Sequence, residues 1–142
     1  MAGLTLAQAQ TIVAAALKHA REKKFAPMGV VVLDARGAMR AYASEDGIAL
    51  KRAEIATGKA FGALAMGVGS RTLGERAVER PHFVAAVTHV VGGSLVPVAG
   101  GVLIKGPDGF LGAVGVTGDT SDNDEACALA GIAAAGLTAQ PG

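Results

Sequence analysis

The 142-residue sequence predicts one α/β (α+β) domain, residues 1–142, built on an antiparallel sheet. Its length falls within the range of a single compact domain. A hydrophobic fraction of 51% and a charged fraction of 18% are enough to fill a core and argue against disorder. Helical and strand-like patterns follow one another as helix, two strands, helices, three strands and helix. Short turns join consecutive strands, so we expect antiparallel pairing, with the helices covering one face.

The N-terminal part predicts a helix followed by a β-hairpin. Thr5 opens a capping box, and apolar residues then recur every three or four positions to about residue 24. Residues 28–33 are apolar and rich in β-branched side chains, which is typical of a buried strand. Residues 34–37 combine an aspartate with a glycine, as a tight turn requires, so residues 38–43 should return as the second strand.

The rest of the chain predicts further helices, a strand-rich region and a final helix. Helices are expected near 48–67, 72–79 and 82–90, and strands near 95–98, 102–104 and 110–117. The final helix should open at Ser121, with Asp124 as its capping partner. Its expected apolar stripe comprises Ala126, Leu129, Ala130, Ala133, Ala134 and Leu137. The tail after Leu137 is expected to be loose.

Composition limits the partners of the chain. Lys and Arg number 13 against 12 Asp and Glu, and only five aromatic residues accompany them, so nucleic acid is not expected. No apolar run is long enough to span a membrane and no secretion signal opens the sequence, which predicts a cytoplasmic protein without membrane contact. Cys127 is the single cysteine and sits among apolar residues, as a core residue would. Alanine-rich helix faces and glycine-rich strands predict a homo-oligomer, a dimer or larger.

The sequence carries no recognisable catalytic motif. Neither a Gly-x-Ser-x-Gly nucleophile pattern nor a phosphate-binding loop is present, because the glycine-rich residues 112–118 lie inside a predicted strand. Four acids, Asp119, Asp122, Asp124 and Glu125, lack the spacing of a calcium loop. Carboxylates in the first turn of a helix complement its dipole, so we interpret them as capping and solvated groups.

A few basic residues are candidates for binding a ligand. His82 and His89 are seven residues apart, hence on one face of a helix, and haem needs only one or two axial ligands. Lys59 lies in an apolar stretch, where its ammonium group either reaches solvent or meets an anion in a cleft. Arg71 lies in an irregular region, where it either holds a carboxylate, such as a haem propionate, or stays solvated.

Four segments in fixed order give the chain a family resemblance. They are Ile55-Ala56-Thr57-Gly58-Lys59-Ala60, Leu95-Val96-Pro97-Val98-Ala99-Gly100-Gly101-Val102, Leu111-Gly112-Ala113-Val114-Gly115-Val116-Thr117-Gly118 and Asp124-Glu125. Together they resemble the GlcG/HbpS-like (haem-degrading) domain family. The resemblance implies a profilin-like or PAS-like fold, a five-stranded antiparallel sheet with flanking helices, in a homo-oligomer.

The resemblance also implies binding residues and a ligand. It implies roles for Lys59, Gly100, Gly101, Gly115 and Gly118, and for Thr117, which stands where a serine is common in the family. Haem is the implied ligand, so the leading hypothesis is a small-ligand-binding domain. The alternative is an enzyme acting on a small organic acid, with Lys59 and an arginine holding the anion and Asp124 or Glu125 as base. A structural oligomer without ligand is the third hypothesis.

Overall fold

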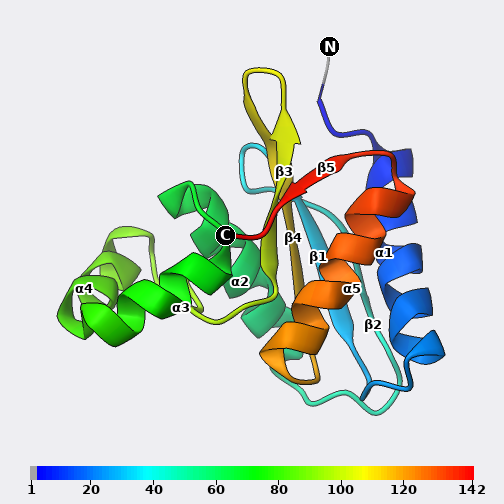
Figure 1. The fold of residues 1–142 in the computed structure, drawn as a ribbon, viewed down its shortest axis with the longest axis horizontal. Helices are drawn as coiled ribbons and strands as arrows, with labels where there is room; N and C mark the ends of the chain where they lie inside the picture. Colours follow the sequence, from blue (N-terminus) through cyan, green and yellow to red (C-terminus); the bar gives the residue numbers. More distant parts are fainter. Residues whose placement is uncertain (1–2) are drawn as a thin grey trace.

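A computed structural model describes residues 3–142 and has a five-stranded antiparallel sheet as its centre (Figure 1). The strands are β1 (Gly29–Asp34), β2 (Met39–Ser44), β3 (Gly101–Gly106), β4 (Gly109–Thr117) and β5 (Thr138–Gln140). Their order across the sheet is β2-β1-β4-β3-β5, and every neighbouring pair is antiparallel. This confirms the predicted α/β class and antiparallel sheet.

Helices cover both faces of the sheet, so the expectation that they cover one face is wrong. The helices are α1 (Leu6–Glu22), α2 (Arg52–Met66), α3 (Ser70–Glu79), α4 (Pro81–Val90) and α5 (Ser121–Ala134). Helices α1 and α5 lie side by side on one face and α2 lies on the other (Figure 1). The reason is that β1 is buried along its whole length: Val30 and Val32 face α1 and α5, while Val31 and Leu33 face α2.

Helices α3 and α4 extend sideways from this body as an arm, residues 70–90 (Figure 1). A small core holds the arm in place, and in it Leu73 and Val84 of the arm are buried together with Leu95 from the segment that follows α4. Most other side chains of α4 are exposed or half-buried. The arm therefore leaves a large part of α4 free of contacts with the rest of the described chain.

Local sequence chemistry sets several element boundaries as predicted. The Thr5 hydroxyl accepts a hydrogen bond from the Gln8 backbone N–H at 3.1 Å, and the Gln8 side chain accepts one from Thr5 N–H at 3.0 Å. Gly37 in the β1–β2 turn has φ of +83°, a conformation that glycine adopts without strain. The predicted helices at 72–79 and 82–90 correspond to α3 and α4.

Two predictions about the strands are wrong. Residues 95–98 are irregular and join no sheet, because Pro97 has no N–H and Val96 donates its N–H to the Gly58 carbonyl of α2 at 3.1 Å. The tail is not loose, since its residues 138–140 form β5 and pair with β3. The sheet thus has five strands, but the last one comes from the C-terminal segment.

The N-cap of the final helix and the face that it buries both differ from the prediction. Its N-cap is Thr120, whose hydroxyl accepts from the Asn123 N–H, and Asp124 takes no part in the cap. The buried residues of the helix are Asp124, Cys127, Ala128, Gly131 and Ile132, whereas Ala133 and Ala134 are exposed. The predicted stripe is therefore wrong at Ala133 and Ala134, whereas Leu129 and Leu137 do pack against the core, and the buried face also brings a carboxylate into the core. None of the described helices is long and apolar enough to cross a membrane.

Candidate functional site

The resemblance-implied residues gather at one end of the sheet, around a buried ion pair between Lys59 and Asp124. Lys59 comes from α2 and Asp124 from α5, and the side chains of both are only 2% exposed. The Lys59 ammonium donates to Asp124 Oδ2 at 3.0 Å and to the Val116 carbonyl of β4 at 2.9 Å. Asp124 Oδ1 accepts from the Asp119 N–H at 2.9 Å. The Lys59 ammonium group therefore does not reach solvent. It meets an anion, and that anion is a carboxylate of the protein itself, Asp124.

Burial opposes the charged form of both partners. It lowers the pKa of Lys59 and raises the pKa of Asp124, while the attraction between the two groups acts in the opposite direction on each. Every buried side-chain nitrogen and oxygen among the described residues has a hydrogen-bond partner. The pair therefore has the satisfied geometry that a buried ion pair needs, and neither group is free to meet a substrate.

Gly100 and Gly101 make room for this lysine and its helix. A Cβ atom on Gly100, whose φ is +125°, would lie 2.8 Å from Lys59 Nζ, and one on Gly101 would lie 2.2 Å from the Lys59 carbonyl oxygen. The Ser70 hydroxyl also accepts from Gly101 N–H at 2.6 Å. These two glycines are needed because α2 and its lysine pass directly against the start of β3.

Gly115 and Gly118 permit similar close approaches along and after β4. A Cβ on Gly115 would lie 2.0 Å from the Ala56 carbonyl oxygen of α2. Gly118 has φ of +148°, and a Cβ there would lie 2.1 Å from the Pro27 carbonyl oxygen. Gly115 pairs with Gly101 across the β3–β4 ladder, so the two form a side-chain-free floor beneath α2.

Thr117, the last residue of β4, is buried and accepts a hydrogen bond from Arg52 Nη1 at 2.9 Å. The hydroxyl at this position thus has a partner on α2, a residue that sequence reasoning did not select. No sequence pattern indicated it, because the two residues are 65 positions apart. Arg52 thus ties the first turn of α2 to the end of β4, as Lys59 ties the middle of the helix to Val116.

The acids near α5 are not a metal centre, and among residues 3–142 no group of His, Cys, Asp and Glu could hold a metal ion. Asp119 accepts from the backbone N–H groups of Ala26 at 2.6 Å and Thr120 at 2.7 Å, which lower the pKa of its carboxyl group. Asp122 and Glu125 both pair with Arg71. The interpretation as capping and solvated groups is wrong for Asp124, which is buried in the pair with Lys59.

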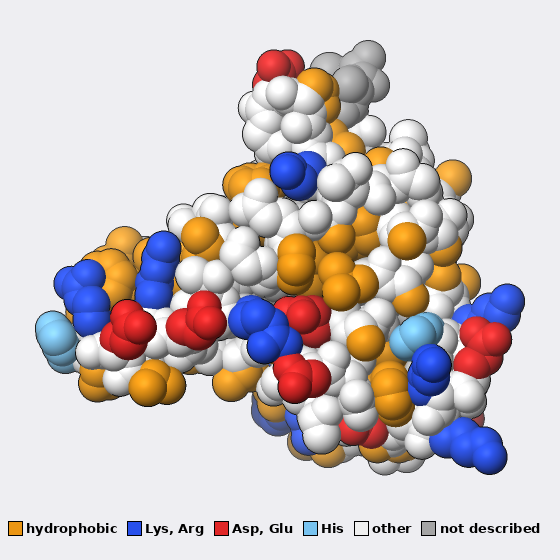
Figure 2. All heavy atoms as spheres, in the orientation of Figure 1, with side chains coloured by type: hydrophobic (Ala, Val, Ile, Leu, Met, Phe, Trp, Pro, Cys, Tyr) orange, Lys and Arg blue, Asp and Glu red, His pale blue; other side chains and the backbone are white. Residues whose placement is uncertain are grey.

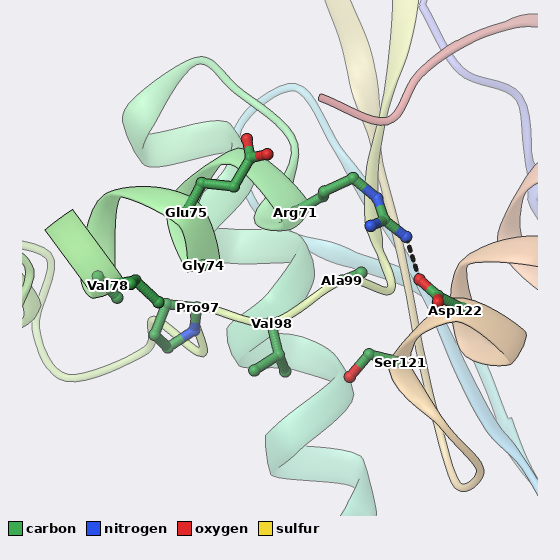
Figure 3. A pocket seen from close by; sticks show the side chains of 10 residues that line it. Arg71, Gly74, Glu75, Val78, Pro97, Val98, Ala99, Ser121 and Asp122 are labelled. Atoms are coloured by element: carbon green, nitrogen blue, oxygen red, sulfur yellow. Dashed lines mark hydrogen bonds and ion pairs between the residues drawn. The ribbon is translucent and has the colours of Figure 1, made fainter.

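Arg71 bridges α3 to the start of α5 and borders a cavity (Figure 3). Its Nε donates to Glu125 Oε2 at 2.9 Å, and its Nη2 donates to Glu125 Oε1 at 3.2 Å and to Asp122 Oδ1. Glu125 and Asp122 raise the pKa of Arg71 above its ordinary value. Figure 2 shows basic and acidic side chains next to one another on the surface between the arm and the body of the molecule.

The cavity beside Arg71 has a volume of about 480 Å³, within the usual range for small-molecule sites. Its residues come from α3, from the irregular segment before β3 and from the first turn of α5. They are Arg71, Gly74, Glu75, Ala77, Val78, Pro97, Val98, Ala99, Ser121 and Asp122. Three charged groups, Arg71, Glu75 and Asp122, therefore lie beside an apolar wall, and neither Lys59 nor Asp124 borders this space.

His82 and His89 lie on α4, away from that cavity, and both are exposed. Ala85 and Ala86 lie between them on the same helix and are exposed as well. Seven residues of α-helix place the two histidine Cα atoms about 10 Å apart on one face. Figure 2 shows a histidine side chain at the tip of the arm.

Cys127 is buried, as predicted, and burial raises the pKa of its thiol to about 12.

Known proteins resemble this chain in fold and in sequence pattern. The crystal structure of HbpS is 27% identical, with a TM-score of 0.80, and the match covers 94% of this chain and 90% of that one. The crystal structure of a PduOC:heme complex is 23% identical, with a TM-score of 0.85 and coverage of 96% and 97%. The Klebsiella pneumoniae protein ORFY is also 23% identical, with a TM-score of 0.84 and coverage of 94% and 90%.

These likenesses establish the fold, including its sheet and its flanking helices. In sequence, no curated protein matches this chain. The family model described as haem degrading protein HbpS-like matches residues 4–133, which is nearly the whole chain. The chain therefore belongs to the HbpS-like family of haem-degrading proteins.

Proposed function

We propose that this protein is a small-ligand-binding domain that takes up haem on the exposed face of α4. Membership of the HbpS-like family and the fold shared with PduOC, whose crystal structure is a heme complex, support haem as the ligand. The observation that carries the position of the site is the pair of exposed histidines on one face of α4, with only alanine side chains between them.

The residues of α4 fit the chemistry that haem requires. Haem iron takes axial ligands such as imidazole, thiolate, thioether or phenolate. The cavity beside Arg71 is lined by none of these groups, whereas α4 presents two imidazoles. Ala85 and Ala86 leave the helix surface between them flat, which suits a planar macrocycle. His82 or His89 would therefore hold the iron, and bound haem would supply a redox-active centre.

Arg80 supplies a cation at the same end of the arm. Its guanidinium group lies over the Phe83 ring, 4.6 Å from the ring centroid, which orients the side chain beside the start of α4. Arginine pairs well with carboxylates such as haem propionates. The arm therefore combines an iron ligand, a flat apolar strip and a cation within one turn of His82.

The test is a haemin titration of the purified apo-protein. The parent should give a sharpened, saturable Soret band, and alanine at the ligating histidine should shift the band and weaken binding by roughly tenfold or more. Alanine at the other histidine serves as the matched control and should have little effect. Should the variant lacking both His82 and His89 bind haemin like the parent, the proposed iron ligation is wrong.

We also propose that the protein is a homo-oligomer, because one face of α4 can cover only one side of a porphyrin. Val90 on the arm is a large hydrophobic side chain left exposed, which a second subunit would cover. Light scattering at micromolar concentration and ordinary salt should give a multiple of the 14.0 kDa subunit mass. A mass near that of one subunit would refute the assembly.

The cytoplasmic location stays a prediction, which cell fractionation tests.

The alternative, an enzyme acting on a small organic acid, draws less support from the geometry at Lys59. Its ammonium group is buried and bound to Asp124 and the Val116 carbonyl, so it has no access to an outside anion. Glu125, the other candidate base, is engaged by Arg71. These groups are better suited to holding the fold together than to catalysis.

A further inference from the structure

The Arg71 guanidinium group at the cavity has no role in the proposed haem binding on α4. Two of its nitrogens are hydrogen-bonded to carboxylates, and the third faces the cavity without an acceptor in the part of the chain that the structure describes. Glu125 fixes the orientation, since it accepts from both Nε and Nη2 of Arg71 and its side chain is only 13% exposed. Among residues 3–142, none accepts a hydrogen bond from Arg71 Nη1. In Figure 3 that nitrogen is turned away from Asp122, towards the side of the cavity where Gly74 lies.

The second carboxylate on Arg71 is of a different kind. Asp122 borders the cavity, and its side chain is 81% exposed, so solvent surrounds most of it. An exposed carboxylate contributes little to stability through such a pair and can be exchanged for another carboxylate with little change in local charge. Asp122 therefore occupies a position on Arg71 that the carboxylate of a ligand could take.

The rest of the cavity suits the body of a small aliphatic acid. Val78, Pro97 and Val98 form an apolar wall (Figure 3), and the Ser121 hydroxyl supplies one neutral polar group. Glu75 also borders the cavity, so the carboxylate of a ligand must bind close to Arg71, where the guanidinium group offsets this repulsion (Figure 3). We propose that this cavity binds small aliphatic monocarboxylates, whose carboxylate displaces Asp122 from Arg71 while the chain lies against Val78, Pro97 and Val98. An arginine whose orientation Glu125 already fixes is well suited to this exchange. Its planar guanidinium group can donate from Nη1 and Nη2 to the incoming carboxylate while Nε stays bound to Glu125.

The test is a titration of the full-length chain with sodium butyrate, followed by ligand-observed NMR. Butyrate should bind saturably, and n-butanol, which has a similar chain without the carboxylate, should not. Arg71→Gln should weaken butyrate binding by roughly tenfold or more, because it removes the charge that the ligand needs. Asp122→Asn should strengthen binding by about threefold or more, because it removes the competing internal carboxylate.

Two further variants provide a substitute for Arg71→Gln and a control. Val78→Glu places a negative charge at the cavity on a side chain that is 84% exposed, so it should weaken butyrate binding without unfolding the protein. This variant replaces Arg71→Gln if that protein fails to fold. Arg36→Gln is the matched control, because Arg36 is an exposed arginine of the distant β1–β2 turn and should leave binding unchanged.

The outcomes separate this site from the haem site. If butyrate binding does not saturate, or if neither Arg71→Gln nor Val78→Glu weakens it, the cavity is not a carboxylate site. If Asp122→Asn strengthens haemin binding and not butyrate binding, the carboxylate comes from a haem propionate and the free-acid proposal is overturned. Loss of haemin binding in the His82 and His89 variants, with butyrate binding intact, supports both sites independently.

Discussion

Replacing Lys59 with methionine is expected to lower the free energy of unfolding by about 3–5 kcal/mol at neutral pH, because it leaves a buried carboxylate without its cation. Asp124 would keep only the Asp119 N–H as a partner for its charge. Methionine approximates the length of the lysine side chain, so little of the effect comes from lost packing. Urea denaturation of the parent and the variant measures the difference.

The pH dependence of this deficit distinguishes an unpaired charge from a packing defect. Burial raises the pKa of Asp124, and removal of Lys59 removes the attraction that opposes this rise. The folded variant then binds more protons than the unfolded chain at pH values above the ordinary 3.8, so its stability falls as pH rises through that window. The deficit should therefore be smaller at about pH 5 than at about pH 8.

A double variant provides the control for the same prediction. Lys59→Met combined with Asp124→Leu replaces the whole pair with apolar side chains and should regain most of the lost stability. Equal losses in the single and double variants, with no dependence on pH, would contradict the assignment of the effect to an uncompensated charge.

Replacing Gly115 with alanine is expected to destabilise the protein by about 3 kcal/mol or more, because the new methyl group has no space. It would lie 2.0 Å from the Ala56 carbonyl oxygen and 3.1 Å from the Ala60 Cβ, and the first of these is helix backbone that cannot swing aside. Helix α2 would have to move away from β3 and β4 together. Thermal melting and the yield of soluble protein report the effect.

Gly3→Ala is the matched control, because a Cβ at Gly3 meets no atom within 4 Å. That variant should melt close to the parent. If Gly115→Ala also melted close to the parent, the close contact between α2 and β4 would not hold in solution. Gly101→Ala should behave like Gly115→Ala, since its Cβ would strike the Lys59 carbonyl oxygen of the same helix.

Much of the fold was predictable because local chemistry decides it. The capping box at Thr5 and the turn after Asp34 depend on residues within four positions of one another. Helix α2 ends, as expected, at Gly67, which has φ of +72°. Such features are encoded where they occur, so reading neighbouring residues is enough to find them.

The errors arose where distant contacts decide the structure. Residues 95–98 look like a strand, but Leu95 and Val96 pack against Gly62 and Gly58 of α2, and this contact replaces sheet pairing. The three residues of β5 carry no strong strand preference and gain their order by pairing with β3. Neither outcome can be inferred from a local pattern, because the partner lies far away in the sequence.

The candidate site was predictable only in part. The resemblance selected Lys59 and the glycines of β3 and β4, and the structure brings them together at one end of the sheet. Sequence reasoning placed Lys59 and Asp124 in one hypothetical active site but did not predict that they pair with each other across 65 positions. One indication was available, since Asp124 precedes the buried Cys127 and Ala128 by three and four positions and therefore shares their helix face.

The ion pair between Lys59 and Asp124 has a mechanical consequence for the molecule. It joins two helices that lie on opposite faces of the sheet, passing the strand end at Gly100. Detaching α2 alone would leave the Asp124 carboxylate buried beneath α5 without its cation. Detaching α5 alone would leave the Lys59 ammonium group buried beneath α2 without its anion. The two layers should therefore open together as one cooperative unit, and partial unfolding should be confined to the arm.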